Sequence, residues 1–345
     1  MVVETDFPSI SRAPTTTLQG WRSFIASTPP SISLPSPDAI AGMGPAERER
    51  FDEQRISYHS ELVTVETSAV RSITNQGRLL MMLNQREVSA RRGLIVSGPW
   101  ASGKTTAIKL LGKTHELLVR RKYPNQDRIP VVYITTPPKG SPRKLASEFA
   151  NFLGLPQRPR QNVTDIADAV CQVLTEAKTD LVIVDEIHNL NLATSAGEDM
   201  SDHLKYFTEH MPATFVYAGI NVENSGLFTG LRGRQISARS VLTTTGPFPC
   251  AEEWTALVAG LENALLLRNH EQGSLTMQAR YLHHRTGGSI SSLSHLVRQA
   301  AIMAILTGRE AIGRDLLDDT VIDHAAETLS PRPSAKRGAV NGPAA

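Results

Sequence analysis

A glycine-rich segment with the spacing G-x-x-x-x-G-K-[ST] is the strongest chemical signal in the chain, and it consists of Gly98, Pro99, Trp100, Ala101, Ser102, Gly103, Lys104 and Thr105. It follows the apolar run 94–97 and precedes a helical pattern at 106–113. Its two glycines permit a turn that points backbone N–H groups at phosphate oxygens, beside the positive end of a helix. We therefore expect this loop, with Thr106, to bind ATP phosphates, Lys104 to reach the β and γ phosphates, and Thr105 to ligate Mg²⁺.

A pair of acids supplies the second half of such a site. Asp185 and Glu186 follow the apolar run 181–184 in LVIVDEIHNL. Asp185 is placed to hold Mg²⁺, and Glu186 to polarise a water that attacks the γ-phosphate. An acid beside the metal ligand favours hydrolysis of ATP over transfer to a small acceptor. His188 is expected to bond locally, and the neighbours His283 and His284 lack the spacing of metal ligands.

The elements that position these residues follow an alternating pattern. Continuous apolar runs at 94–97, 131–135, 181–185, 214–219 and 241–245 predict strands buried on both faces. Helical patterns lie between them, including one that Ser141 caps and Gly154 ends, and another that begins near Thr164. Strand and helix in alternation predict an α/β P-loop NTPase fold, doubly wound around a mostly parallel sheet.

Four regions are expected along the chain. Residues 1–60 form an N-terminal arm, partly disordered, with a short helix whose apolar positions are Leu18, Trp21, Phe24 and Ile25. Residues 61–247 form the P-loop core. Residues 248–329 form a helical lid domain with helices at 254–267, 276–284, 290–306 and 316–329. The polar tail 330–345 is expected to be disordered.

Composition narrows the class of protein. The chain of 345 residues is 40% hydrophobic and 20% charged, as expected of a protein with a large core. Its two cysteines, Cys171 and Cys250, indicate a reducing cytoplasm and packing roles. Because no apolar run of about 18 residues is present and the N-terminus lacks a signal-peptide pattern, we expect a cytoplasmic protein without a membrane partner. Because the net charge is only +2, any binding of nucleic acid would have to come from a local basic patch.

The motifs together resemble the AAA+ ATPases of bacterial transposition, the TniB, TnsC and MuB-like group. The resemblance spans roughly residues 60–328 and rests on GPWASGKT, LVIVDEIHNL, VYAGINVENSGLF, RGRQISARSVLTTTGPF and RTGGSISSLSHLVRQA. It implies the AAA+ version of the P-loop fold, with ATP and Mg²⁺ as ligands.

The resemblance also implies roles for single residues. Asn221 corresponds to a sensor that hydrogen-bonds the γ-phosphate or the attacking water, although a turn residue is an equal alternative. Arg239, with Arg234 as the alternative, corresponds to an arginine presented to the nucleotide of the next subunit. The lid departs from the pattern, because GGSISSL has Ser where relatives carry a sensor arginine. Arg285 or Arg298 are candidate substitutes, with a structural role on a helix as the alternative.

Members of this group assemble as rings or helical filaments on double-stranded DNA and recruit or activate a DDE-type transposase. The same function is implied here, with sequence-independent contacts to DNA. Lys139, Arg143 and Lys144 are candidate phosphate contacts, and the basic run 120–122 is another. Solvated charge at helix ends is the alternative for each residue.

Two other functions remain open from the sequence. One is a nucleotide-gated signalling or scaffold ATPase that binds a protein partner and no DNA. The other is a helicase-loader-like ATPase with the same core chemistry and a replication protein as its partner. ATP-dependent assembly on duplex DNA distinguishes the transposition function from the scaffold.

Overall fold

The computed structural model describes residues 13–28, 32–61, 65–138, 140–190, 195–224 and 230–329. The chain divides into two compact units. Unit 1 comprises Met1–Thr28 and Glu66–Gly246, and unit 2 comprises Pro29–Val65 and Pro247–Ala345. Residues from the predicted arm, 1–60, contribute to both units, while the four-region division itself stays a prediction. The predicted tail, 330–345, lies outside the described residues.

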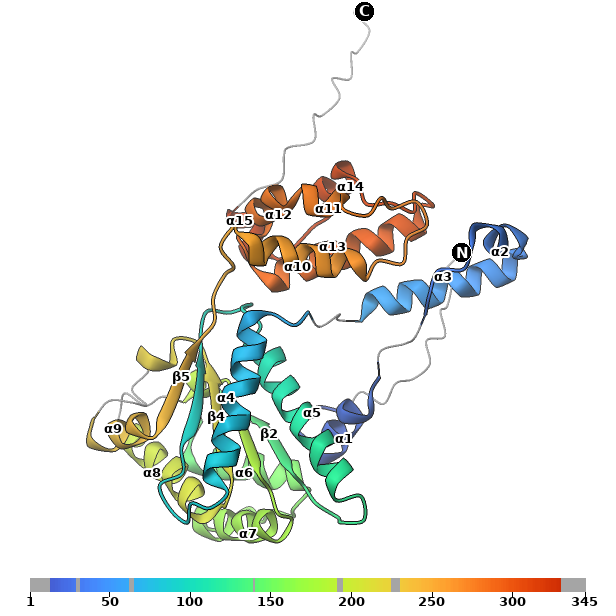
Figure 1. The fold of residues 1–345 in the computed structure, drawn as a ribbon. Helices are drawn as coiled ribbons and strands as arrows, with labels where there is room; N and C mark the ends of the chain where they lie inside the picture. The colour runs from blue at the N-terminus through green and yellow to red at the C-terminus, as the bar shows by residue number, and fades with distance from the viewer. Residues whose placement is uncertain are drawn as a thin grey trace, which may run out of the picture. The chain divides into compact units, whose positions relative to one another are not determined.

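Unit 1 is built on a five-stranded parallel sheet in the order β2-β3-β4-β1-β5 (Figure 1). Its strands are β1 (Gly93–Ser97), β2 (Val131–Thr135), β3 (Leu181–Asp185), β4 (Thr214–Gly219) and β5 (Ser240–Thr244). All but β5 are buried along nearly their whole length, which explains why unbroken apolar runs predicted them. The edge strand β5 is half-exposed.

Helices cover both faces of this sheet (Figure 1). On one face lie α4 (Ser68–Asn84) and α5 (Lys104–Lys122), and on the other α6 (Pro142–Leu153), α7 (Val163–Glu176) and α8 (Ser195–His210). Short elements complete the unit: η1 (Ile187–Asn189), η2 (Val222–Asn224) and α9 (Gly230–Ala238). The predicted cap at Ser141 and stop at Gly154 are present, whereas α7 is capped by Asn162, two residues before the predicted start. The doubly wound, parallel α/β class is confirmed.

The predicted N-terminal helix is α1 (Leu18–Ala26), and it packs on α5. Its Trp21 is fully buried and donates a hydrogen bond from Nε1 to Glu116. Gly112 of α5 is the point of close approach, because a Cβ there would lie 2.9 Å from the Trp21 ring. This helix is therefore part of the core of unit 1.

In the described residues of unit 2, all regular secondary structure is helical. Its helices are α2 (Pro37–Gly42), α3 (Pro45–Ser60), α10 (Glu252–Asn263), α11 (Ser274–Met277), α12 (Ala279–Thr286), α13 (Ile290–Leu306), α14 (Arg314–Asp319) and α15 (His324–Leu329). The central α13 has the predicted bounds, and α3 packs against it. The helix predicted at 316–329 is two helices, because the backbone is extended at Thr320 and Asp323 accepts a hydrogen bond from the backbone of the new helix at Ala326. The helix predicted at 276–284 is likewise divided, at Gln278.

A buried ion cluster ties α3 to the loop after α13. Both terminal nitrogens of Arg55 donate to the Glu310 carboxylate, at 2.7 and 2.8 Å. Arg268 donates to the same carboxylate from its backbone and its side chain. Burial alone would raise the pKa of Glu310, but the hydrogen bonds from Arg55 and Arg268 outweigh it and lower the pKa to about 2.

Two further predictions concern the cysteines and the absence of a membrane-spanning helix. Cys171 is buried as expected of a packing residue, whereas Cys250 is exposed. Among the described residues no single helix has the length and apolar character needed to cross a membrane; only the bent pair α12 and α13, at 114° to each other, passes that test together.

We expect Glu310→Gln to lower the free energy of unfolding of unit 2 by about 3–5 kcal/mol at neutral pH, because Arg55 would stay buried without its counter-charge. The folded pKa lies below the ordinary 4.5, so the stabilisation is present above pH 4.5 and is lost as the pH falls toward about 2. That loss amounts to about 3 kcal/mol for a shift of this size. Denaturant titrations at several pH values measure both effects.

The control is Glu271→Gln, which removes an exposed carboxylate from the same unit. It should leave the stability and its pH dependence nearly unchanged. Equal losses in the two variants would show that the cluster does not stabilise unit 2.

Candidate nucleotide-binding site

The phosphate-binding loop leaves the end of β1 and enters α5 in a conformation that its glycines permit. Gly103 has φ 82° and forms the N-cap of α5. Gly98 lies so close to Thr245 that a Cβ would collide with the carbonyl and hydroxyl oxygens of that residue. The side chain of Ser102 accepts or donates a hydrogen bond with the Thr245 hydroxyl at 2.8 Å. The loop is therefore held against the end of β5 as well as β1.

Lys104 is buried, with 7% of its surface exposed, inside this loop. Its Nζ donates to the carbonyls of Gly98 at 3.0 Å and Pro99 at 2.6 Å. Burial lowers the pKa of Lys104, and the negative charges of Glu186 and Asp185 partly oppose that effect. A phosphate in the loop would offer this ammonium group anionic acceptors in place of neutral carbonyls.

The carboxylate of Asp185, at the end of β3, accepts hydrogen bonds from two other elements and from the next residue in the chain. Its Oδ2 accepts hydrogen bonds from Thr105 Oγ1 at 2.8 Å and from the Tyr133 hydroxyl at 2.9 Å. Its Oδ1 accepts from the backbone N–H of Glu186 at 2.8 Å. Since Asp185 is only 1% exposed, these donors replace the hydration that the carboxylate has lost.

Tyr133 links this carboxylate to the N-terminal helix. Its ring stacks on that of Trp21, with centroids 5.7 Å apart and planes at 12°. Lys109 Nζ of α5 also lies over the Tyr133 ring, 4.7 Å from its centroid. Burial, followed by the charge of Asp185, raises the pKa of the Tyr133 hydroxyl, which therefore remains a donor at any working pH.

Glu186 follows in a left-handed conformation, with φ 57°. That conformation costs a residue with a side chain about 1 kcal/mol or more. The Glu186 carboxylate is 44% exposed and lies 3.3 Å from His188 Nε2. His188 Nδ1 accepts the backbone N–H of Ile220 at 3.2 Å, so the ring proton is assigned to Nε2, which donates to Glu186. The expected local bonding of His188 thus orients the Glu186 side chain.

The turn after β4 lies at the same edge of the sheet. Asn221 is exposed and has φ 45°. The next residue, Val222, donates its N–H to Ser97 Oγ at 2.9 Å, and that hydroxyl donates to Glu223. This small network ties the turn to the end of β1, directly before the phosphate-binding loop.

The arrangement fits a nucleotide with a divalent cation. A hydroxyl oxygen and a carboxylate oxygen 2.8 Å apart are hard oxygen donors of the kind that Mg²⁺ prefers. Thr105 and Asp185 are thus the residues that would hold the ion, and backbone N–H groups of the loop would face the phosphates. Trp100, in the same loop, is 70% exposed. Elsewhere in the described part of the chain no group of His, Cys, Asp and Glu could hold a metal.

Arg239, a candidate for contact with a neighbouring subunit, lies at the far end of β1 from this loop. The Arg239 carbonyl accepts the N–H of Gly93, at the start of β1, whereas the loop follows the end of that strand. Five residues of strand separate the two ends by about 15 Å. Arg239 and Arg234 are both exposed. The backbone of Arg239 is thus at the opposite end of β1 from the phosphate-binding loop of its own chain.

The candidate DNA contacts and lid arginines have different environments. Lys139 lies outside the described residues, and Lys144 is exposed. The Arg143 guanidinium donates to backbone carbonyls of residues 158–161, including Pro159 at 3.1 Å, so it stabilises that loop. Arg285 is buried and paired with Glu327 at 2.7 Å, and Arg298 donates to the carbonyls of His59 and Ser60. Both lid arginines therefore hold unit 2 together.

Sequence reasoning missed Tyr133 and Lys109. A usable signal existed for Tyr133, because a tyrosine inside a strand buried on both faces must place its hydroxyl against a partner. In the register of β2 with β3, Thr135 is paired with Asp185. Tyr133, two residues before Thr135, therefore lies on the same face of the sheet as Asp185. Lys109 could be found from its position one helical turn after Thr105.

A family model described as bacterial TniB protein matches residues 55–230, slightly more than half of the chain. The curated proteins contain no significant match.

Several solved structures share the fold at low sequence identity. The ORC2 protein of Aeropyrum pernix, solved in ADPNP-ADP complexes, has a TM-score of 0.58 and 18% identity over 76% of this chain and 69% of that chain. The ORC1 protein of the same organism, solved in complex with DNA, has a TM-score of 0.57 and 14% identity over 79% of this chain and 66% of that chain. Cdc6p from Pyrobaculum aerophilum has a TM-score of 0.50 and 16% identity, over 72% and 65%. These likenesses identify the fold as that of AAA+ P-loop proteins.

We expect Tyr133→Phe to lower the free energy of unfolding of unit 1 by about 1–2 kcal/mol, because Asp185 loses one of its donors while the ring still stacks on Trp21. Denaturant titration measures the change. Tyr123→Phe is the matched control, since no hydrogen bond of the Tyr123 hydroxyl is found among the described residues, and it should change the stability by less than about 0.5 kcal/mol. Similar losses for both variants would contradict the inferred importance of the hydrogen bond.

Proposed function

The chain belongs to the family of bacterial TniB proteins and has the AAA+ fold, and from this premise we propose that it hydrolyses ATP while assembled on double-stranded DNA. The observation that best supports ATP hydrolysis is the hydrogen bond from Thr105 to Asp185. It joins the end of the phosphate-binding loop to the residue directly before Glu186. A nucleotide hydrolase must bind the phosphates, the metal ion and the attacking water side by side. The oxygen and nitrogen groups that could do so are all at this edge of the sheet.

Glu186 is the residue that we propose to orient the attacking water and to accept its proton. Its carboxylate is exposed enough to reach a water, and His188 holds it from one side. The bound Mg²⁺ would neutralise charge on the phosphates. Lys104 would contribute a further positive charge from within the loop, and Asn221 would hydrogen-bond the γ-phosphate or the water from the turn after β4.

A second subunit would complete the site. We propose that Arg239, or Arg234 in its place, reaches the nucleotide of the neighbouring copy and stabilises charge on the transferring phosphoryl group. Both side chains are exposed, and the Arg239 backbone lies at the opposite end of β1 from the loop of its own chain, which supports a role between copies. Hydrolysis would then depend on assembly into a ring or filament.

DNA binding and a transposase partner extend the proposal beyond the ATPase. Family membership supports both, since TniB-like proteins resemble one another in acting beside a DDE-type transposase. Exposed Lys144 at the start of α6, together with Lys139, would contact phosphates without reading sequence. Arg143 is a weaker candidate, because its guanidinium is engaged with backbone carbonyls. We propose that the assembled protein recruits or activates the transposase at its target.

We expect duplex DNA to stimulate ATP turnover by the wild type, and Glu186→Gln to lower turnover by roughly 100-fold or more. Glutamine keeps the size of the side chain but cannot accept the proton, so ATP-dependent assemblies should persist or lengthen. Phosphate release and light scattering on one sample measure both properties.

Lys104→Ala is the comparison that separates binding from hydrolysis, because it should abolish assembly together with turnover. If DNA changes neither ATP turnover nor assembly, the proposal of an ATPase that assembles on DNA is contradicted. A scaffold ATPase with a protein partner would then be favoured. Stimulation by a replication protein, without any by DNA, would favour a helicase loader.

We expect His188→Asn to lower kcat about tenfold with little change in KM, because the shorter side chain can still accept the Ile220 N–H but cannot reach Glu186. His188→Gln places an amide N–H nearer the position of Nε2 and should retain more activity. Steady-state kinetics of the two variants test this difference. Equal activities, or a change confined to KM, would be evidence against a positioning role.

A further inference from the structure

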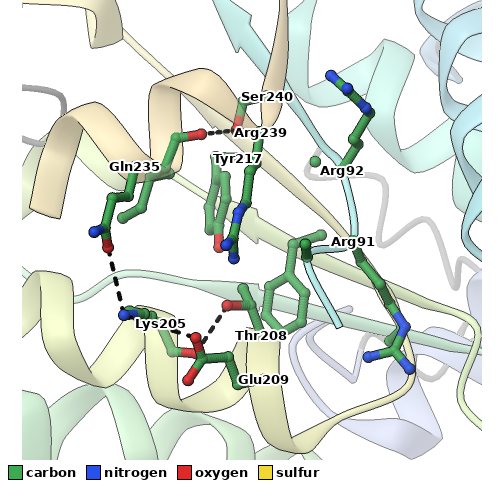
Figure 2. A pocket seen from close by; sticks show the side chains of 14 residues that line it. Arg91, Arg92, Lys205, Thr208, Glu209, Tyr217, Gln235, Arg239 and Ser240 are labelled. Atoms are coloured by element: carbon green, nitrogen blue, oxygen red, sulfur yellow. Dashed lines mark hydrogen bonds and ion pairs between the residues drawn. The ribbon is translucent and has the colours of Figure 1, made fainter. Parts of the chain in front are cut away.

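A small cavity lies in unit 1 at the amino-terminal ends of β1 and β5, away from the phosphate-binding loop (Figure 2). Its accessible volume is about 50 Å³, which suits one small group and not a nucleotide. The chain contributes to it from β1, α8, β4, α9 and β5. Phe215, Ala213 and Ile236 supply the apolar part of the lining.

One lining residue, Tyr217, has a hydroxyl donor without an acceptor in the described part of the chain. Tyr217 on β4 is only 2% exposed, and its hydroxyl makes no hydrogen bond to any of the described residues. Burial raises the pKa of this phenol, so the group remains protonated. A buried hydroxyl without a partner is unfavourable, and native proteins leave few of them. The hydroxyl therefore marks a place where an acceptor is expected.

The charged lining is mostly positive. Arg91, Arg92, Lys205 and Arg239 line the cavity with Glu209 as the only acid among its lining residues. Figure 2 shows the Arg239 guanidinium directed toward the hydroxyl end of Tyr217, and the Arg92 side chain directed away.

The other two cations are already engaged. Lys205 lies 3.7 Å from Glu209 and 3.4 Å from the Gln235 side chain, and Arg91 donates to the Met211 carbonyl. For the Arg239 side chain no hydrogen bond or ion pair to another described residue is found. None of its N–H donors is therefore used by another described residue.

We propose that this cavity binds one compact oxyanion, a carboxylate or a phosphate, between the Tyr217 hydroxyl and the Arg239 guanidinium. A phenol O–H and a planar guanidinium together offer donors only, which matches the acceptor oxygens of such an anion. Apolar walls strengthen the attraction by lowering the local dielectric. The cavity lies away from the phosphate-binding loop of its own chain, and anion binding there does not depend on ATP hydrolysis. It does use Arg239, which is one of the two arginines proposed to reach the nucleotide of a neighbouring copy.

The experiment titrates the full chain with sodium phosphate and, separately, with glutarate, a stand-in for an acidic side chain. Lys104→Ala serves as the background, because the phosphate-binding loop would otherwise add its own binding. Calorimetry gives the affinities. We expect Tyr217→Phe to fold, since it removes an unpaired hydroxyl, and to weaken anion binding by about tenfold or more.

Arg239→Gln should weaken binding at least as much, while Arg86→Gln, an equal loss of charge at an exposed position outside the cavity, should not. Binding of phosphate alone would indicate a free anion, and binding of glutarate alone a carboxylate delivered by a protein. Selenate in crystals of the full chain should give an anomalous peak within hydrogen-bond distance of the Tyr217 hydroxyl.

Three results would overturn the proposal. One is anion affinity that Tyr217→Phe and Arg239→Gln both leave unchanged. Another is a cavity that holds only water at millimolar phosphate and glutarate. The third is an equal loss of affinity in Arg86→Gln, which would mean that a general positive field attracts the anion.

Discussion

A buried carboxylate that needs donors from several elements is the constraint on which unit 1 depends. Asp185 is almost fully withdrawn from water and accepts hydrogen bonds from α5, from β2 and from the residue after it. An ionised group at such a position is stable only when donors replace its hydration. The oxygens that would hold a metal therefore also fix where α5 begins and where β2 must lie.

Backbone strain gathers around the same point. Ala101, Glu186 and Asn221 each have a positive φ, and they stand on the loops that follow β1, β3 and β4. Such conformations persist only where the surroundings enforce them, and they are found most often at functional sites. Here the parallel sheet brings three loops of this kind to one edge, which is the place where α/β folds bind ligands.

The sequence was most informative where one physical signal dominated. Continuous apolar runs located the strands to within a residue or two, and the glycine spacing located the loop that joins β1 to α5. The Tyr133 hydrogen bond depends on strand register, and the bond from His188 to Glu186 depends on a backbone N–H over thirty residues away. Neither leaves a local pattern. The role of α3 was missed for a related reason, because its partners, Glu310 and α13, lie far along the chain.

The stacking of Trp21 on Tyr133 makes the start of the chain part of the nucleotide site's support. A fragment that begins at residue 61 would contain every motif of the core yet would lose this indole, leaving a hollow against Tyr133 and Gly112. Removal of a buried tryptophan costs about 3–5 kcal/mol. Any measurement on such a fragment would report a loosened Asp185 rather than the native one, so the smallest unit that keeps this site intact includes α1 as well as the core.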